Sequence, residues 1–267
     1  MALMDSEMRF SKTGDTVGRE SRMQQLLSQL LADAARDWNL PKGIVVAICV
    51  LPLFVVLTGI GTGLVSKELY KWFIDEDRVA ENVQVLAYVL SCFMSLWIAI
   101  QLRKVNRNGF ALLYLCAAVG LFLTAGEEIS WGQRLFSWQT PQLMAEINRQ
   151  QETTLHNIVG VEQVFNMGKL AAGLYGTIVP LLVLYWWDKL APYRRTLSLL
   201  VPHYALAFYF FVPATWRLYR DFAPEPTQYQ WAIAEFSEVT ELDLALGILF
   251  FLIFQLKHIQ SNIRDQA

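Results

Sequence analysis

Two adjacent carboxylates, Glu127 and Glu128, stand directly after an uncharged apolar run at residues 110–125. A membrane-crossing helix needs ~20 residues, so a helix that begins with this run brings both carboxylates to the point where it leaves the membrane. If the helix continues, Glu127, Trp131 and Arg134 share one face, and Glu128 projects ~100° away from it. Carboxylates in such a place can exchange protons, bind a cation or pair with the arginine.

A second group of polar side chains lies in the segment that follows. Its members can donate, accept or ligate, and they are Gln133, Asn148, Gln151, Glu152, His156 and Asn157. Carboxylates with one imidazole suit a divalent ion such as zinc, manganese or iron, and the same groups can act as general acids or bases. The alternative, in which His156 and Asn157 only satisfy loop backbone, stays open.

A third group lies near the C-terminus, where Glu235, Glu238 and Glu241 are spaced by three and form a stripe on a helix, while Asp243 points away from Glu241. An ionised aspartate near the membrane centre costs at least ~2.5 kcal/mol. Unless the helix begins later and leaves the stripe in water, these groups must be paired, protonated, hydrated or bound to a cation. The expected counter-charges are Arg134, Arg149, Arg217 and Arg220.

The composition of the chain is that of an integral membrane protein. Of its 267 residues, 54% are hydrophobic and only 17% are charged. The net charge of −2 argues against a nucleic-acid partner. Cys49, Cys92 and Cys116 fall in apolar runs and are expected to be buried free thiols. The first forty residues are polar or amphipathic and do not have the pattern of a cleavable signal peptide.

The elements that position these groups are predicted to be helices, so the fold class is all-α, a polytopic bundle of about six transmembrane helices. The expected spans are 44–65, 83–102, 110–129, 168–187, 197–216 and 231–256. They make up a membrane domain at 43–257. A cytoplasmic N-terminal segment, 1–42, carries an amphipathic helix at 23–38, which lies on the membrane surface or packs on a partner. A cytoplasmic tail, 258–267, ends the chain.

Between the third and fourth spans, residues 126–166 are expected to form an interfacial or re-entrant helical segment. Thr140 and Pro141 predict an N-cap and the first residue of a short helix. Trp131 and Trp138 can seat the segment at the level of the lipid headgroups. A short loop with several charges is expected between the first two spans.

The resulting motif string resembles a family of uncharacterised bacterial multipass membrane proteins. The resemblance rests on residues 126–134 (GEEISWGQR), on Thr140 and Pro141, on Asn148, Gln151 and Glu152, and on residues 155–157 (LHN). It covers roughly residues 110–160 and implies a multi-pass protein of the bacterial inner membrane. It carries no activity with it.

The first hypothesis for function is an enzyme at the outer leaflet of the membrane. Its catalytic groups are expected among Glu127, Glu128, Arg134, Glu152, His156 and Glu238. Of these, Glu128, His156 and Glu238 are expected to meet in one polar cavity as ligands of a divalent metal ion, and a lipid or lipid-linked substrate enters from the bilayer. The other members of the expected polar cluster are Trp131, Gln133, Asn148, Gln151, Asn157, Arg217, Glu235 and Glu241.

Two further hypotheses stay open. One is a non-catalytic membrane subunit or assembly factor in which the polar cluster is structural. The other is an ion- or proton-coupled transporter, whose intramembrane carboxylates bind cations during alternating access. Against the transporter, no inverted repeat is visible in the sequence, and the cytoplasmic half of the predicted bundle offers little polar lining.

The distribution of basic residues predicts the orientation of the chain. The N-terminal tail, the second and fourth connections and the C-terminus are basic and nearly free of acids, whereas the other connections are mixed or acidic. The positive-inside rule therefore places both termini in the cytoplasm and the polar groups outside. A Gln139→Cys variant that lacks Cys49, Cys92 and Cys116 should react with an impermeant thiol reagent in intact cells. Labelling only after the membrane is breached would reverse the orientation.

Overall fold

The computed structural model describes residues 22, 24–75, 77–148, 151–158, 160–224 and 228–264, with backbone alone at 134, 135 and 262–264. The chain divides into two units, residues 1–49 and 50–267, and each is described by itself. In the first unit, residues 24–38 are helical, as the sequence predicts, and Leu26 and Leu27 are half exposed. This helix ends at Asn39, whose left-handed backbone (φ 49°) is typical of a helix C-terminus.

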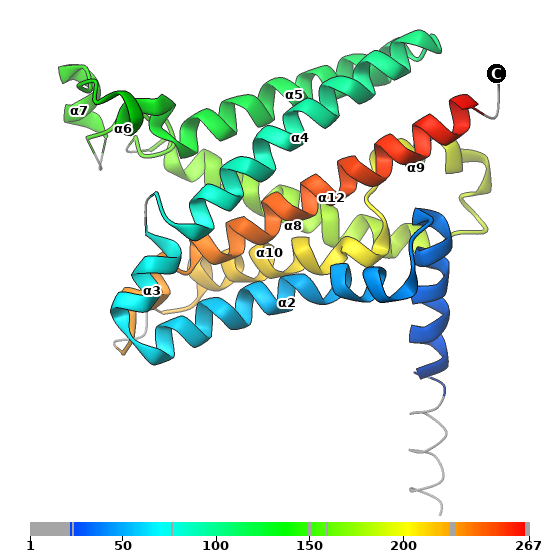
Figure 1. The fold of residues 1–267 in the computed structure, drawn as a ribbon, viewed down its shortest axis with the longest axis horizontal. Helices are drawn as coiled ribbons and strands as arrows, with labels where there is room; N and C mark the ends of the chain where they lie inside the picture. The colour runs from blue at the N-terminus through cyan, green and yellow to red at the C-terminus, as the bar shows by residue number, and fades with distance from the viewer. Residues whose placement is uncertain are drawn as a thin grey trace, which may run out of the picture. The chain divides into compact units, whose positions relative to one another are not determined.

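The described part of the chain is all-α, and the predicted fold class is confirmed. Helix α2, Lys42–Val65, begins in the first unit and continues into the second. The other helices are α3 (Lys67–Ile74), α4 (Val79–Lys104), α5 (Asn108–Glu128), α6 (Gln133–Phe136), α7 (Gln142–Ile147), α8 (Glu162–Tyr185), α9 (Arg194–Leu200), α10 (Ala207–Phe222), α11 (Gln230–Glu235) and α12 (Ser237–Arg264) (Figure 1). Short 3-10 turns lie at Ser130–Gly132, Ala191–Tyr193 and Tyr204–Leu206.

Six stretches within the described residues are long and apolar enough to cross a membrane. They are Lys42–Val65, Lys67–Lys104, Asn108–Glu128, Glu162–Tyr185, Ala191–Phe222 and Gln230–Ser261. Large apolar side chains on them face outward, among them Phe54, Phe93 and Leu112, each more than 60% exposed. Such a surface is stable in lipid and costly in water. The chain therefore has the architecture of a multi-pass membrane protein.

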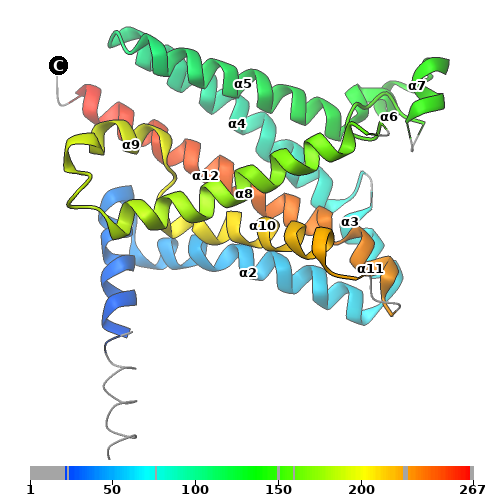
Figure 2. The same cartoon turned by 180° about the vertical axis from the view of Figure 1, so that it is seen from behind.

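In the second unit, helix α12 is central to the packing. α4 packs against both α5 and α12, and α10 packs against both α12 and α8, so that the helices follow one another in the order α5, α4, α12, α10, α8 (Figures 1 and 2). α8 and α10 approach closely because Gly176 has no side chain. A Cβ atom there would lie 2.2 Å from the Phe210 ring.

The second unit has two ends, which we name for the helices found there. The α3 end carries α3, α6, α7 and α11, whereas the α9 end carries α9, the turn between α4 and α5, and the last turns of α12 (Figure 1). Figure 2 shows α9 in the connection between α8 and α10, beyond the end of both helices.

Three expected elements differ in detail from the structure, although the fifth and sixth expected spans lie within stretches that can cross a membrane. The loop expected after the first span contains helix α3, whose start is capped because Ser66 Oγ accepts a hydrogen bond from the Leu69 amide at 3.0 Å. The fifth span is broken after α9, where Pro202 cannot donate a backbone hydrogen bond and the His203 imidazole accepts one from the Ala205 amide at 3.2 Å. The sixth is two helices joined at Phe236.

The three cysteines are free thiols, as predicted. The expectation that they are buried was wrong, because Cys49 and Cys92 are only half-buried and Cys116 is exposed. Cys116 lies on α5, whose outward residues are apolar, so its thiol belongs to the surface that lipid covers.

Candidate functional site

The first cluster of polar groups forms around Glu127, in the last turn of α5 at the α3 end. Its carboxylate is 5% exposed. Oε1 accepts a hydrogen bond from Trp131 Nε1 at 2.8 Å, and Oε2 accepts from the backbone amides of Leu155 and His156 at 2.6 and 3.1 Å. The His156 Nδ1 atom lies 3.2 Å from the same oxygen. One carboxylate therefore ties the loop after α7 to the end of α5.

Helix α5 ends immediately after this carboxylate, in a tight turn. α5 ends at Glu128, and Ser130, Trp131 and Gly132 follow with left-handed backbone at φ 48°, 55° and 78°. Helical backbone of this hand costs roughly 1–2 kcal/mol per non-glycine residue. The turn folds the Trp131 ring onto α5, and this packing offsets part of the cost. The ring lies so close to Gly126 that a Cβ atom there would meet it at 2.9 Å.

The expectation that Glu127, Trp131 and Arg134 share a face of one continuing helix was therefore wrong. Trp131 still reaches Glu127, but through the turn and not through helical spacing. The side chain of Arg134 and the whole of Arg149 lie outside the described residues.

The loop between α6 and α8 is held by its own amide side chains. Gln133 donates to Thr140 Oγ1 at 2.7 Å and accepts from the Thr153 amide at 2.8 Å. Asn148 donates to the Thr154 carbonyl and hydroxyl at 2.7 and 3.0 Å, and Asn157 donates to the same hydroxyl at 3.2 Å.

Two consequences follow for the expected residues of this loop. The hydroxyl of Ser130 donates to Glu152, which places Glu152 beside the turn after α5, whereas Gln151 is exposed with left-handed backbone at φ 58°. Thr140 was expected to cap the short helix, but its hydroxyl accepts from Gln133, and α7 begins after Pro141 without a side-chain cap.

The second cluster lies inside the bundle and is organised by Lys169 of α8. Its Nζ atom forms an ion pair with Glu241 Oε2 of α12 at 2.5 Å, with 31% and 12% of the two side chains exposed. Glu128 of α5 interacts electrostatically with both Lys169 and Glu241, and Glu238 interacts with the same groups. Three carboxylates thus surround one described lysine between helices α5, α8 and α12.

Helix α4 contributes a stripe of polar side chains to this interior. Glu81, Gln84, Tyr88, Ser91 and Ser95 follow one another at spacings of three and four, so they share one helix face, and all are buried. Tyr88 lies within electrostatic reach of Glu128, Glu238 and Glu241. We call this set the α4 stripe. It spans ~21 Å along the helix, at ~1.5 Å per residue.

Two members of the α4 stripe have polar atoms without a hydrogen bond of normal geometry among the described residues, although the Gln84 amide lies within interaction distance of Glu128. Gln84 is fully buried and faces Glu128. Neither polar atom of its amide, nor the Ser91 hydroxyl, has a hydrogen-bond partner of normal geometry within the described ranges. Buried polar groups in native proteins are almost always satisfied, often by water. Polar groups beside α4 can therefore form further hydrogen bonds, for example with water.

Hydrogen bonds continue the α4 stripe towards the α9 end. Ser95 donates to the Tyr114 carbonyl at 2.8 Å, and the Tyr114 hydroxyl donates to the Leu199 carbonyl of α9 at 2.6 Å. Gln255 of α12 donates to the neighbouring carbonyl of Ser198. Ser95, Tyr114 and Gln255 thus bring polar groups into the α9 half of the bundle, whereas the sequence predicted little polar lining for the half expected on the cytoplasmic side.

The two clusters meet at the end of α5. Glu127 and Glu128 are neighbours in sequence but face different ways, so Glu127 holds the loop while Glu128 enters the bundle. Glu128 also interacts electrostatically with His156. Of the expected residues, Glu127, Trp131 and His156 thus join the first cluster, and Glu128, Glu238 and Glu241 join the second.

Two charged side chains, Glu235 and Arg217, do not lie where the sequence suggested, whereas a third, Asp243, does. Glu235 ends α11 and is separated from α12 by Phe236, so the stripe through Glu238 and Glu241 is interrupted. Arg217 was expected as a counter-charge, but it pairs with Asp221 one turn along α10, with Nε 3.1 Å from Oδ2. The carboxyl of Asp243 is buried, points away from Glu241 as expected, and has no described hydrogen-bond partner.

The expected metal-ligand set is not assembled. Within the described ranges, no group of three or more histidine, cysteine, aspartate or glutamate side chains is arranged to hold a metal ion. Glu128 is close enough to interact with His156 on one side and with Glu238 on the other, but the three groups belong to two clusters.

Sequence reasoning missed Lys169 and the α4 stripe. Lys169 lies near the start of an apolar run, and the sequence predicts an ordinary span there. The α4 stripe had a visible signal, because five polar residues recur at spacings of three and four in an otherwise apolar helix.

Comparisons with models of protein families, with curated proteins and with solved structures find no match for this chain. Fold and site alone therefore define the class of protein. It is an all-α, multi-pass membrane bundle with a charged cluster enclosed by α4, α5, α8 and α12.

The first cluster predicts a structural role for Glu127. In a Glu127→Gln variant the amide nitrogen cannot accept the bonds that Oε2 receives from Leu155 and His156. Leaving buried donors unsatisfied costs ~1–3 kcal/mol, so we expect a lower melting temperature in detergent and faster proteolysis within residues 137–158. Glu146→Gln, on the exposed side of α7, is the control and should change neither. Equal behaviour of the two variants would contradict the assignment.

Proposed function

We propose that this protein is a proton- or cation-coupled membrane transporter, and that Glu128, Lys169, Glu238 and Glu241 form its exchange site. The observation that carries the proposal is the composition of this cluster. Three carboxylates face one described lysine in helices suited to cross a membrane. A purely structural ion pair needs only equal and opposite charges, so the excess of carboxylates requires another explanation.

Electrostatics explain why such a cluster exchanges protons or cations. Charges taken out of water are expensive unless they are neutralised by a partner. Lys169 can balance one carboxylate, and the others lower their charge by taking up a proton or a cation. Because the four groups lie close together, a change in the charge of one alters the electrostatic field at the others.

The α4 stripe supports a path between the cluster and the α9 end. Hydroxyl and amide groups at Gln84, Ser91 and Ser95 can hold water or relay protons, and Tyr114 extends the series to α9. Intramembrane polar residues that face the interior of a bundle commonly mark ion or proton pathways. The cluster and the α4 stripe are contiguous through Gln84 and Tyr88.

The cellular setting belongs to the same proposal. The positive-inside rule supports cytoplasmic termini, with the α9 end inside and the α3 end outside. The resemblance to bacterial multipass proteins supports a bacterial inner membrane. In this orientation the exchange site lies nearer the outer surface, and the α4 stripe leads from it towards the cytoplasm.

Proton movement into proteoliposomes tests the proposed transport. With a membrane potential imposed, vesicles that contain the protein and a trapped pH dye should acidify faster than empty vesicles. Glu241→Gln should abolish the difference. It also removes the ion pair of Lys169 with Glu241, although Glu128 and Glu238 remain near the lysine. Some loss of stability is therefore expected, below the ~3–5 kcal/mol typical of a buried charge left alone. Glu68→Gln, an exposed change at the same end of the bundle, is the matched control and should retain full activity.

A double variant separates transport from stability. Lys169→Gln with Glu241→Gln removes both charges and should recover most of the melting temperature that the single change loses, but not proton movement. Recovery of both would show that the pair is only structural and would favour a non-catalytic subunit or assembly factor. Wild-type vesicles no faster than empty ones would contradict proton movement.

An enzyme acting at the outer leaflet is a second candidate, which one contact favours. Glu127 lies 3.2 Å from His156 Nδ1 and also binds the backbone of that residue, which fixes the orientation of the ring. A histidine held in this way presents Nε2 as a base or a metal ligand. The bilayer would supply a lipid or lipid-linked substrate, and a divalent metal ion would have to be recruited to His156 and Glu128.

Elemental analysis distinguishes this candidate from the transporter. A metal-dependent enzyme should purify with zinc, manganese or iron near one ion per chain, and His156→Ala should lose that ion. A transporter should purify without it, and His156→Ala should keep at least part of the proton movement. Metal content unchanged in His156→Ala would reject the proposed ligand.

A further inference from the structure

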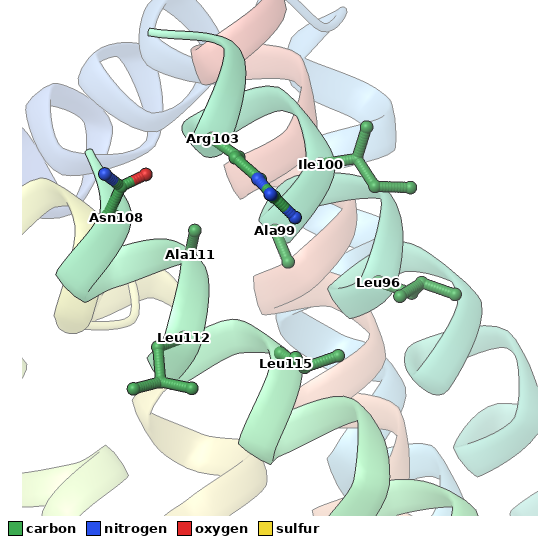
Figure 3. Close-up of a pocket in the computed structure, with 8 residues that line it drawn as sticks. All are labelled: Leu96, Ala99, Ile100, Arg103, Asn108, Ala111, Leu112 and Leu115. Carbon is green, nitrogen blue, oxygen red and sulfur yellow. The ribbon is translucent and has the colours of Figure 1, made fainter. Parts of the chain in front are cut away.

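A groove between α4 and α5 opens at the α9 end of the second unit. It has a volume of about 490 Å³. Its walls are apolar, with Leu96 and Ile100 from α4 and Leu112 and Leu115 from α5. Figure 3 shows Arg103 and Asn108 at the end of the groove nearest the turn, with the leucines further along both helices. The groove is therefore apolar along its length and polar at one end.

A second groove runs along the other side of the same α4 residues. It has a volume of about 350 Å³ and lies between α4 and the end of α12, where Leu256 and Gln260 line it. Leu96 and Ile100 line both grooves, so these two side chains form a ridge between them. Two apolar grooves on either side of one ridge match a ligand with two hydrocarbon chains.

The charge at the turn between α4 and α5 determines which headgroup fits. Arg103, Lys104 and Arg107 lie there, and the sequence has no aspartate or glutamate from residue 82 to residue 126. No described carboxylate forms an ion pair with Arg103. A guanidinium binds phosphate oxygens through parallel charge-assisted hydrogen bonds, and the Asn108 amide can donate beside it.

We propose that this surface binds one anionic diacyl phospholipid. Its phosphate contacts Arg103 and Asn108, and its two acyl chains lie on either side of the ridge formed by Leu96 and Ile100. Basic pockets between membrane helices on the cytoplasmic side are typical sites for anionic lipids. Ile100 and Leu112 on the apolar walls are 44% and 61% exposed. A hydrocarbon chain would cover them, whereas a soluble phosphate would not.

Lipid binding to the purified, delipidated protein tests the proposal. Native mass spectrometry in detergent with added phosphatidylglycerol should show one retained lipid per chain, and phosphatidylcholine should be retained less. Arg103→Gln should weaken phosphatidylglycerol binding by at least ~10-fold, the loss expected when a charge-assisted hydrogen bond is removed. Lys104→Gln removes the neighbouring charge, which does not line the groove, and should weaken binding much less.

Four outcomes would overturn the proposal. Equal binding of the two lipids would show that the surface does not prefer an anionic headgroup. Equal losses of affinity in Arg103→Gln and Lys104→Gln would show that positive charge attracts the lipid without a specific site at Arg103. Displacement of the lipid by millimolar inorganic phosphate would indicate an anion site without a role for the grooves. A stable dimer that excludes lipid would show that a second copy of this chain covers the surface. Melting curves confirm that both variants remain folded.

Discussion

The ion pair between Lys169 and Glu241 is the interaction on which the interior of this bundle depends. α10 packs against both α8 and α12 and so separates them in the helix packing. The long side chains of Lys169 and Glu241 span the distance between α8 and α12. Glu128 and Glu238 can lie at the same depth because the lysine offsets part of their mutual repulsion. Among the described lysines and arginines, only Lys169 is known to face these three carboxylates.

The position of Glu127 beside Glu128 joins this interior to the loop outside it. Glu127 binds the backbone at Leu155 and His156, and Glu128 faces Lys169. A small rotation of the last turn of α5 would move both carboxylates at once. The loop and the cluster are thus connected structurally through two consecutive residues.

Sequence periodicity was enough to predict the fold class, because membrane spans are set by the length of apolar runs. It was not enough to locate the end of α5, since the left-handed turn at Ser130 and Trp131 is stabilised by contacts with Gly126 and Glu127 that form only after folding. The counter-charge of Glu241 could not be chosen from the sequence either. Several cations were available, and only the packing of α8 brings Lys169 within reach while Arg217 is taken by its neighbour Asp221.

The bundle is chemically asymmetric along its helices, so the two ends of the α4 stripe lie near opposite charges. At the α3 end, carboxylates outnumber the lysine they surround, whereas the turn between α4 and α5 at the α9 end is basic. A cation or proton is therefore attracted to the first end and repelled by the second. If protons or cations move along Gln84, Ser91 and Ser95, as we propose, the repulsion at the α9 end has to be reduced, and the proposed anionic lipid at Arg103 would reduce it. In that proposal the acidic cluster and the basic turn influence the same path from opposite ends.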